Sequence, residues 1–546
     1  MKKLLININI LTYSLFGFLF WHFAKEMLQV RSNGWYVGQV NLYGDLVYHL
    51  SLINKFLVTN NILIDNPIYA QDKVNYPIFA DFITAQIARI SGVDFALFIT
   101  TFLVGMIALI VAKMFITNFI KNNRIVLLTF LLFFLNGGFG FYYFFQDYSV
   151  SQKGFFDFLF NLPRQYTDIK ELGYWWINSY LAYFIPQRSF LFAFPITLVI
   201  LLLLYRGFKN LNIYYFTLAG ILSGILPIVQ AQSLFVLFIL CVYFIPVSLF
   251  FKQNKKKLLV CWLVFSILTI AIALPLFRLI SSVSNPLTFI KYDPGWTSKE
   301  NIFWFWFKNL GLFAPTLIVA TLWLFKKKHL LIFYLPFLAI FFLCNIFIFQ
   351  PWDFDNSKLL IYWYFASCII VGYFLYINFF ISNILKKITG GILVFIMILS
   401  GSLDIFRTFT TSSSYQIYSN EDLQIAQSVK TLTPQDSIFT TGTNHNNPIS
   451  TLSGRSTLLG FPGWVWSHGI DYSKRQSDVV QIYLGDKNAE NLIKKYHVHY
   501  ITVGPQEKVE FSINLSYFNR YPQIKLDPEW ILYDVSNLWT NSNRQN

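Results

Sequence analysis

Long apolar segments, separated by short clusters of lysine and arginine, restrict the fold of this sequence more than any other feature. The hydrocarbon core of a bilayer is about 30 Å thick, so a helix of about 20 apolar residues can cross it. Residues 213–251 are too long for one crossing, and we divide them at Pro227–Ser233, where polar residues favour a tight turn. We count about eleven apolar runs of roughly 17–25 residues, which begin near Leu4, Phe95, Ile125, Ser189, Ile213, Ala231, Leu258, Asn309, Leu330, Leu360 and Ile388.

The basic residues between these runs indicate how the chain crosses the membrane. With alternating spans, the lysine and arginine clusters all fall on one side, which the positive-inside rule assigns to the cytoplasm. We therefore expect a cytoplasmic N-terminus, an uncleaved signal anchor as the first span, and an extracytoplasmic chain after Arg407. The clusters are Lys2/Lys3, Lys121/Arg124, Arg206/Lys209, Lys252/Lys255/Lys256/Lys257, Lys326/Lys327/Lys328 and Lys386/Lys387.

The composition excludes several other classes of protein. Of the 546 residues 55% are hydrophobic and only 13% are charged, whereas a soluble domain has about 25% charged residues. A cytosolic enzyme, a disordered scaffold and a secreted disulfide-rich module are excluded. The net charge of +15 reflects cytoplasmic loops rather than nucleic-acid binding, and the four cysteines lie in apolar runs without CxxC spacing, which supports neither zinc nor disulfides.

We predict an all-α polytopic membrane domain over residues 1–406 and a small extracytoplasmic α/β domain over residues 407–546. In the tail, helix-like segments alternate with strand-like ones, which is typical of an α/β domain. Residues 25–94 form a long first extracytoplasmic loop, in which we expect amphipathic helices.

The first of these helices contains Asp45 and His49. Apolar residues recur around them at helical spacing, which predicts a helix lying on the membrane surface. Asp45 stands at the helix start, where the helix dipole favours a carboxylate, and His49 projects from the same face one turn later. Two interpretations remain open: an N-cap with a surface histidine, or a catalytic pair placed where a lipid-borne and a water-borne substrate meet.

A second amphipathic helix is predicted from Pro77 through Ile90. It contains Asp81, and we interpret it as a helix that packs under the first.

Charged residues also mark the outer ends of later spans. In the turn Gln350–Lys358, Asp353 and Asp355 could hold a divalent cation such as Mg²⁺ or Mn²⁺, and Lys358 a phosphate; a merely hydrated turn is the alternative. Arg188 lies at the outer mouth of a span, where an arginine is costly unless it is paired or interfacial. We favour phosphate binding over snorkelling for Arg188.

Aromatic residues gather in two outer segments. Trp296 and the aromatic run Phe303–Asn309 form a ledge that is either an interface belt or a platform for sugars. In the tail, a glycine- and tryptophan-rich loop with Trp464 and His468 is too apolar for a free surface loop, and we expect it to fold back over a membrane-side cleft.

Taken together, this order of features resembles the polyprenyl-phosphate-sugar-dependent glycosyltransferases of the GT-C fold, and more narrowly a bacterial branch of that superfamily. The resemblance covers nearly the whole chain, although each motif is short. The motifs are Gly44-Asp45-x-x-x-His49, Tyr76-Pro77, Pro186-Gln187-Arg188, Gln350-Pro351-Trp352-Asp353-x-Asp355-Asn356-x-Lys358 and Ser453-Gly454-Arg455.

The resemblance implies an inverting sugar transfer from a polyprenyl-phosphate donor to a glycan, lipid or protein of the cell envelope, on the outer face of a bacterial cytoplasmic membrane. Asp45 is then the general base, His49 orients Asp45 or the acceptor, and Arg188 and Lys358 neutralise the leaving phosphate. Leu46 follows Asp45 where the family commonly has a second acid, which would have to come from Asp353 or Asp355. The expected substrate-binding residues are Tyr76, Trp296, Asp353, Arg455, Trp464 and His468.

Two functions of other classes remain as alternatives: a lipid or polysaccharide translocase, and a non-catalytic subunit of an envelope-assembly complex. The spans lack the buried chain of charged residues and the paired interrupted helices that are typical of transporters, which counts against the first.

Overall fold

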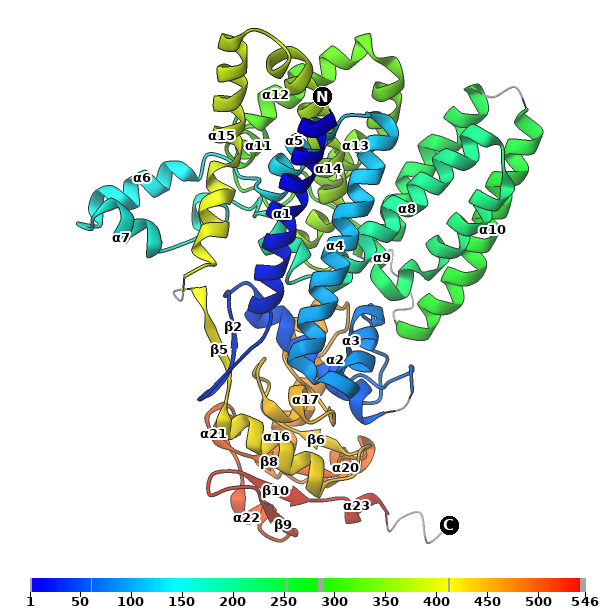
Figure 1. The fold of residues 1–546 in the computed structure, drawn as a ribbon. Coiled ribbons are helices and arrows are strands. Elements are labelled where there is room, and N and C mark those ends of the chain that lie inside the picture. The colour runs from blue at the N-terminus through cyan, green and yellow to red at the C-terminus, as the bar shows by residue number, and fades with distance from the viewer. Residues whose placement is uncertain (1, 60, 252–253, 283–288, 411–412, 541–546) are drawn as a thin grey trace. The chain divides into compact units, whose positions relative to one another are not determined.

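The computed structural model describes residues 2–59, 61–251, 254–282, 289–410 and 413–540 (Figure 1). Lys252, of the fourth basic cluster, lies outside these ranges. The chain divides into two compact units. We call them the helical unit (Met1–Glu26, Ile99–Leu276 and Leu287–Ser414) and the mixed unit (Met27–Phe98, Phe277–Pro286 and Tyr415–Asn546).

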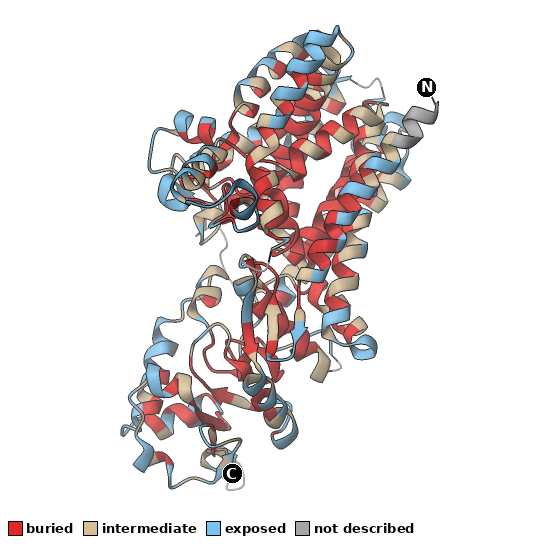
Figure 2. Cartoon of the chain, turned by 60° about the vertical axis from the view of Figure 1, so that its left-hand side comes forward, coloured by how far each residue is buried: buried red, intermediate tan, exposed pale blue. Residues whose placement is uncertain are grey.

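The helical unit is a bundle of long apolar helices. Buried residues fill its interior, and exposed residues gather on the outward faces of the helices (Figure 2). Its elements, of which α4 begins and α10 ends in the mixed unit, are α1 (Lys2–Glu26), α4 (Val93–Phe119), α5 (Asn123–Phe134), α6 (Phe141–Val150), α7 (Phe155–Phe160), η1 (Lys170–Leu172), η2 (Tyr180–Phe184), α8 (Arg188–Asn210), α9 (Ile213–Phe251), α10 (Lys255–Ile280), β3 (Lys291–Tyr292), α11 (Ile302–Leu310), α12 (Phe313–Trp323), η4 (Leu324–Lys326), α13 (Lys328–Ile346), β4 (Phe347–Ile348), η5 (Asp353–Asn356), α14 (Ser357–Leu375), η6 (Tyr376–Phe380) and α15 (Ile384–Arg407).

Within the described residues, seven helices are long and apolar enough to span a membrane, and the bent pair α11 and α12, which meet at 98°, raises this to eight. The expected multi-pass helical architecture is therefore confirmed. The remaining expected spans are also helical, but α5 has only 12 residues and α9 runs through two of the expected spans. α1, with 25 residues, is not among the seven.

The predicted turn inside residues 213–251 is confirmed. The backbone of Gln230 leaves the helical region, with φ −168° and ψ 110°. Trp262 of α10 contacts both halves of α9: its ring lies 5.0 Å from that of Phe216, and its Nε1–H donates to Ser248 Oγ at 2.9 Å. Because residues 32 apart on a straight helix would be about 48 Å apart, the two halves run antiparallel.

The mixed unit is built on a five-stranded sheet of order β7-β6-β8-β10-β9. The expected α/β character of the tail is confirmed: β6 pairs in parallel with β7 and β8, and β10 pairs antiparallel with β8 and β9. The elements are β1 (Gln29–Arg31), β2 (Gly34–Val37), α2 (Leu42–Val58), α3 (Phe79–Ser91), β5 (Tyr415–Ser419), α16 (Asn420–Leu432), β6 (Ile438–Thr440), α17 (Pro448–Leu452), β7 (Ser456–Thr457), α18 (Pro462–Ser467), α19 (Ser473–Leu484), α20 (Ala489–Lys495), β8 (Tyr500–Val503), α21 (Pro505–Glu510), α22 (Leu515–Phe518), β9 (Gln523–Lys525), β10 (Ile531–Asp534) and α23 (Asn537–Thr540).

Residues 27–98, most of the loop predicted after the first span, belong to the same compact unit as the tail. β2 pairs antiparallel with β5, with Trp35 opposite Tyr418, in a three-stranded sheet of order β1-β2-β5. α2 packs against both α3 and α17. The loop thus contributes two helices and two strands to the same compact unit as the tail.

Candidate active site

Asp45 lies in the first turn of α2 and is half-buried. The helix itself is confirmed, but the prediction that it lies on the membrane surface as an amphipathic helix is wrong. Every residue from Leu46 through Phe56 is buried, since α3 and α17 cover faces that a surface helix would expose to water. Polar residues inside this stretch have partners within the unit, such as Lys55, whose Nζ donates to Ser456 Oγ at 2.9 Å.

His49, one turn after Asp45, forms a buried pair with Asp81. Its Nδ1 lies 2.9 Å from Asp81 Oδ2 and 3.0 Å from Oδ1, and the side chains are 1% and 0% exposed. An ionised carboxylate only accepts hydrogen bonds, so Nδ1–H donates to Asp81, which fixes the ring's orientation and tautomer. The interpretation of His49 as a surface histidine is therefore excluded.

Asp81 was not among the predicted functional residues. Its helix α3 does pack against α2 as expected, and in addition it supplies the carboxylate that holds His49. The sequence signal was the aspartate inside the apolar run Phe79-Ala80-Asp81-Phe82-Ile83, because aspartates are almost never fully buried unless they are paired.

A group of rings, which we call the ring cluster (Tyr48, Tyr76, Trp464 and His468), lies beside this pair. The ring of Tyr48 is 5.0 Å from that of Tyr76, 5.4 Å from Trp464 and 4.8 Å from His468. The rings of Tyr76 and His49 are 5.8 Å apart. The structure thus brings together four residues that the sequence singled out: His49, Tyr76, Trp464 and His468. The tail loop that carries Trp464 and His468 folds onto the start of α2 in the mixed unit.

Two further polar groups at the ring cluster were missed by sequence reasoning. The Tyr48 hydroxyl and His445 Nε2 are buried and have no hydrogen-bond partner among the described residues. His445 lies against Trp464, with rings 6.4 Å apart, and burial lowers its pKa, so the imidazole is neutral at pH 7. Buried polar atoms without partners are rare in folded proteins, and a ligand or water that bonds to them is the ordinary explanation.

Arg455 is also buried, but its guanidinium is occupied by the protein. It donates to the carbonyl oxygens of Lys430, Thr433 and Ser453 and to Thr433 Oγ1, at 2.7–3.2 Å. These bonds tie the end of α16 to the loop before β7. We therefore leave Arg455 out of the proposed site.

In the helical unit, Arg188 is the first residue of α8 and is 0% exposed. Its guanidinium donates to Thr100 Oγ1 at 3.0 Å and to Thr101 Oγ1 at 3.2 Å, both on α4. A snorkelling arginine keeps its head group in water, so full burial excludes that interpretation. The positively charged guanidinium of Arg188 lies inside the helical unit rather than at its surface.

Lys358 is the second residue of α14, and Asp353 and Asp355 lie in η5, the short helix directly before it. Lys358 Nζ is 3.0 Å from Asp355 Oδ2, and the two side chains are 13% and 11% exposed. Asp353 accepts the backbone N–H of Phe354 at 2.7 Å. No group of three or more His, Cys, Asp or Glu side chains that could hold a metal occurs among the described residues. A cation at Asp353 and Asp355 would therefore compete with Lys358 for Asp355.

Trp296 is 3% exposed and belongs to a packed aromatic core. Its Nε1–H donates to the Asp353 carbonyl at 2.9 Å, and its ring stacks on Trp306 at 5.5 Å and 14°. This geometry does not fit the open sugar platform that we expected for Trp296, because both faces and the edge of the indole meet protein.

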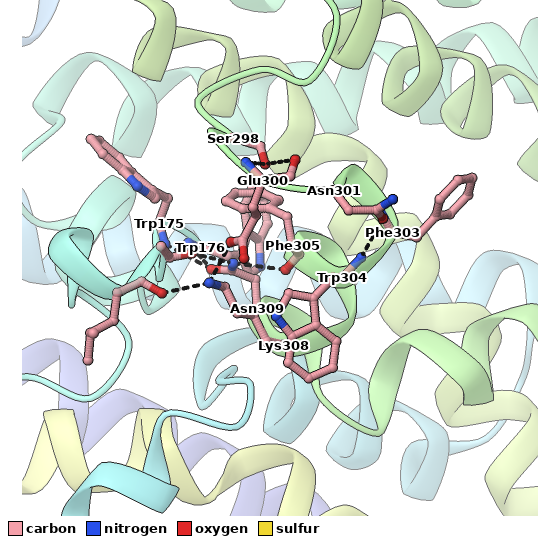
Figure 3. Close-up of polar contacts among 12 residues, drawn as sticks. Trp175, Trp176, Ser298, Glu300, Asn301, Phe303, Trp304, Phe305, Lys308 and Asn309 are labelled. Carbon is pink, nitrogen blue, oxygen red and sulfur yellow. Dashed lines mark hydrogen bonds and ion pairs between the residues drawn. The ribbon is translucent and has the colours of Figure 1, made fainter.

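The rest of the aromatic segment is held against the loop before η2 (Figure 3). Asn309 Oδ1 accepts the backbone N–H groups of Trp175 and Trp176 at 2.8 and 2.9 Å, and Lys308 Nζ pairs with Glu300 at 2.5 Å. Phe303 and Trp304 stay exposed. An interface belt is therefore the interpretation that fits the outer part of this segment.

The fold of this chain is similar to that of solved membrane glycosyltransferase structures, which agrees with the fold that the sequence resemblance predicted. The structure of apo ArnT from Cupriavidus metallidurans matches 97% of this chain and 98% of its own length, with a TM-score of 0.51 at 11% identity. ArnT bound to undecaprenyl phosphate gives 0.49 at 10% identity over the same shares, 97% and 98%.

An oligosaccharyltransferase from Archaeoglobus fulgidus, tethered to an acceptor peptide, gives a TM-score of 0.46 at 11% identity over 86% of this chain. This chain covers 66% of the length of that oligosaccharyltransferase. No protein-family profile and no curated protein matches the sequence.

Proposed function

We propose that this protein is a membrane glycosyltransferase that transfers a sugar from a polyprenyl-phosphate donor to an acceptor of the cell envelope. The observation that carries the proposal is the buried His49–Asp81 pair one turn after Asp45, in a chain with the GT-C fold. A carboxylate that holds a buried histidine in one orientation is the arrangement by which functional sites fix the tautomer of a histidine.

In the proposed reaction, Asp45 accepts the proton of the acceptor hydroxyl as its oxygen attacks the anomeric carbon of the sugar. The bond from that carbon to the phosphate oxygen breaks, and the lipid phosphate leaves with the electron pair. Attack from the side opposite the phosphate inverts the anomeric configuration. His49, held by Asp81, positions Asp45 or the acceptor, and Arg188 and Lys358 neutralise the charge on the leaving phosphate.

The sugar binds at the ring cluster on this proposal. Aromatic faces stack on the apolar faces of sugars, and the Tyr48 hydroxyl and His445 Nε2 offer hydrogen bonds that no described residue takes up. The acceptor class is a glycan, a lipid or a protein on the outer face of a bacterial cytoplasmic membrane. The placement of the basic clusters supports a cytoplasmic N-terminus and an extracytoplasmic tail.

The decisive experiment is sugar transfer by the purified protein in proteoliposomes, with a polyprenyl-phosphate sugar carrying a radiolabel in the sugar. We expect label to pass from the lipid to an envelope acceptor extract only when the protein is present. Export of unmodified lipid-linked sugar across the membrane without cleavage of its phosphate bond would instead support a translocase.

We expect Arg188→Gln to lower the turnover number for transfer by about 10²–10³-fold, the effect of removing one group that stabilises transition-state charge. The matched control is Arg206→Gln on the same helix, because Arg206 is exposed. Since Arg188 is buried, Arg188→Lys provides a second variant that keeps the charge. Full turnover in a folded Arg188→Gln protein would remove Arg188 from the mechanism.

We expect Tyr48→Phe to raise the KM for the sugar donor about tenfold without lowering the melting temperature, since one neutral hydrogen bond contributes about 0.5–1.5 kcal/mol. Among the residues that the structure describes, the Tyr48 hydroxyl has no hydrogen-bond partner to lose. Tyr418→Phe is the matched control, because the Tyr418 hydroxyl donates to Thr451 Oγ1 at 2.6 Å. Tyr418→Phe should lower the melting temperature and leave KM for the donor unchanged. A sugar-binding role of Tyr48 would be contradicted if Tyr48→Phe also left KM unchanged.

A further inference from the structure

The helices α6 and α7 form a hairpin that is too short to span a membrane yet exposes large apolar side chains. α6 has 10 residues and α7 has 6. In Figure 1 both extend sideways from the bundle beside α15. We refer to residues 141–160 as the aromatic hairpin.

One side of the aromatic hairpin packs against the bundle. Phe144 and Phe158 are 4% and 3% exposed, and they belong to one buried cluster with Leu162 and with Leu403 of α15. The backbone is fixed as well: Phe141 N–H donates to Ser400 Oγ at 2.8 Å, and Arg407 Nε–H donates to the Leu162 carbonyl at 3.1 Å. The hairpin is therefore held at a defined level along α15.

The other side consists largely of exposed aromatic and aliphatic residues. Phe156 is 72% exposed and Val150 is 77% exposed. They are joined by Tyr142, Phe145, Phe155 and Phe160, which are 44–57% exposed. Polar residues such as Lys153 and Asp157 are interspersed. A short segment that mixes exposed aromatics with charges is typical of a helix lying in the boundary between headgroups and acyl chains.

The attachment points give the depth of the hairpin in the membrane. α15 is one of the seven apolar spans, and its basic end carries Lys386 and Lys387. At 1.5 Å per residue, Ser400 lies about 20 Å along the helix from Lys387, and Arg407 about 30 Å. Because the hydrocarbon core is about 30 Å thick, the hairpin begins inside the leaflet opposite the lysines and ends at its surface.

We propose that the aromatic hairpin is a membrane-inserted segment. Phe155, Phe156 and Phe160 are buried among the lipids of the leaflet opposite the lysine-rich loops. Its partner is the lipid bilayer itself. The hairpin's outer side chains then meet acyl chains, while Lys153 and Asp157 reach the headgroups. The proposal rests on the spans and on α15, and does not depend on the sugar-transfer function.

The test is site-directed spin labelling of the full chain in lipid nanodiscs. Single cysteines replace Phe156 and Phe160 in a background where the four native cysteines are changed to alanine. Ile267→Cys, on an exposed face of the span α10, is the lipid control, and Val509→Cys, 90% exposed on α21, is the water control. Labels at 156 and 160 should collide more with oxygen than with a water-soluble nickel chelate, as at 267. Nickel accessibility equal to that at 509 would overturn the proposal.

A second measurement uses the wild-type protein, so that a folding defect in a variant cannot decide the outcome. Lipids with a photoreactive group on the acyl chain are activated in the nanodiscs, and labelled peptides are mapped by mass spectrometry. We expect labelled residues in the aromatic hairpin as well as in α10. Labelling of α10 with none in residues 141–160 would overturn the proposal.

Discussion

Asp45→Asn should reduce the turnover number for sugar transfer by about 10²–10⁴-fold, the usual contribution of a general base. The amide has nearly the same shape as the carboxylate but cannot accept the hydroxyl proton. Because Asp45 is half-buried in the first turn of α2, the change should lower the stability of the protein only modestly. Turnover with a labelled polyprenyl-phosphate sugar, measured alongside the melting temperature, checks both expectations.

Asp94→Asn is the matched control for this experiment. Asp94 also lies in the first turn of a helix, α4, and is exposed. Both substitutions remove the same favourable interaction of a carboxylate with a helix dipole, about 0.3–1 kcal/mol. If Asp45→Asn transfers sugar as fast as Asp94→Asn does, Asp45 is not the base.

Asp81→Ala should destabilise the mixed unit by about 3–5 kcal/mol, the cost of removing one partner of a buried pair. The loss leaves the Nδ1 of a 1% exposed His49 without its acceptor. Chemical denaturation of the protein in detergent measures this change in the free energy of unfolding. The matched control is Glu490→Ala, which breaks an ion pair with Arg520 whose side chains are 42% and 47% exposed, and which should cost about 0–1 kcal/mol.

The His49–Asp81 pair also leads to a prediction about the kinetics of transfer. Asp81→Asn keeps the size of the side chain but changes the hydrogen bond that sets the orientation of His49. As a positioning residue, Asp81 should affect the turnover number and leave KM for the donor nearly unchanged. We expect a loss of about 10–100-fold, by analogy with the partners that orient metal-bound histidines. An unchanged turnover number in a folded Asp81→Asn protein would show that the pair is only structural.

The spans and the tail's α/β character could be predicted from the sequence because both depend on local periodicity. Twenty apolar residues between basic clusters have few alternatives in a membrane protein. The turn at Gln230 was predictable for the same reason, since polar residues interrupt an apolar run that is too long for one crossing. Asp45 in a first helical turn also followed from local spacing.

The errors arose where burial depends on distant segments. α2 has the apolar spacing of a surface helix, but α17, about 400 residues later, covers its polar face. Trp296 and Arg455 have side chains suited to sugars and phosphates, yet one stacks on Trp306 and the other bonds to backbone carbonyls. Residue type alone does not reveal which partners the fold has already supplied.

By itself, the sequence determined that this chain has many apolar spans, that an aspartate lies in the first turn of a helix that follows the first span, and that a tail with strands follows the last span. Only the tertiary structure decided which acid holds His49 and which rings surround it. Asp81 lies 32 residues from His49 and Trp464 more than 400 residues away. Hydrophobic periodicity is a property of neighbours along the chain, whereas a buried hydrogen bond depends on elements that meet only when the chain has folded.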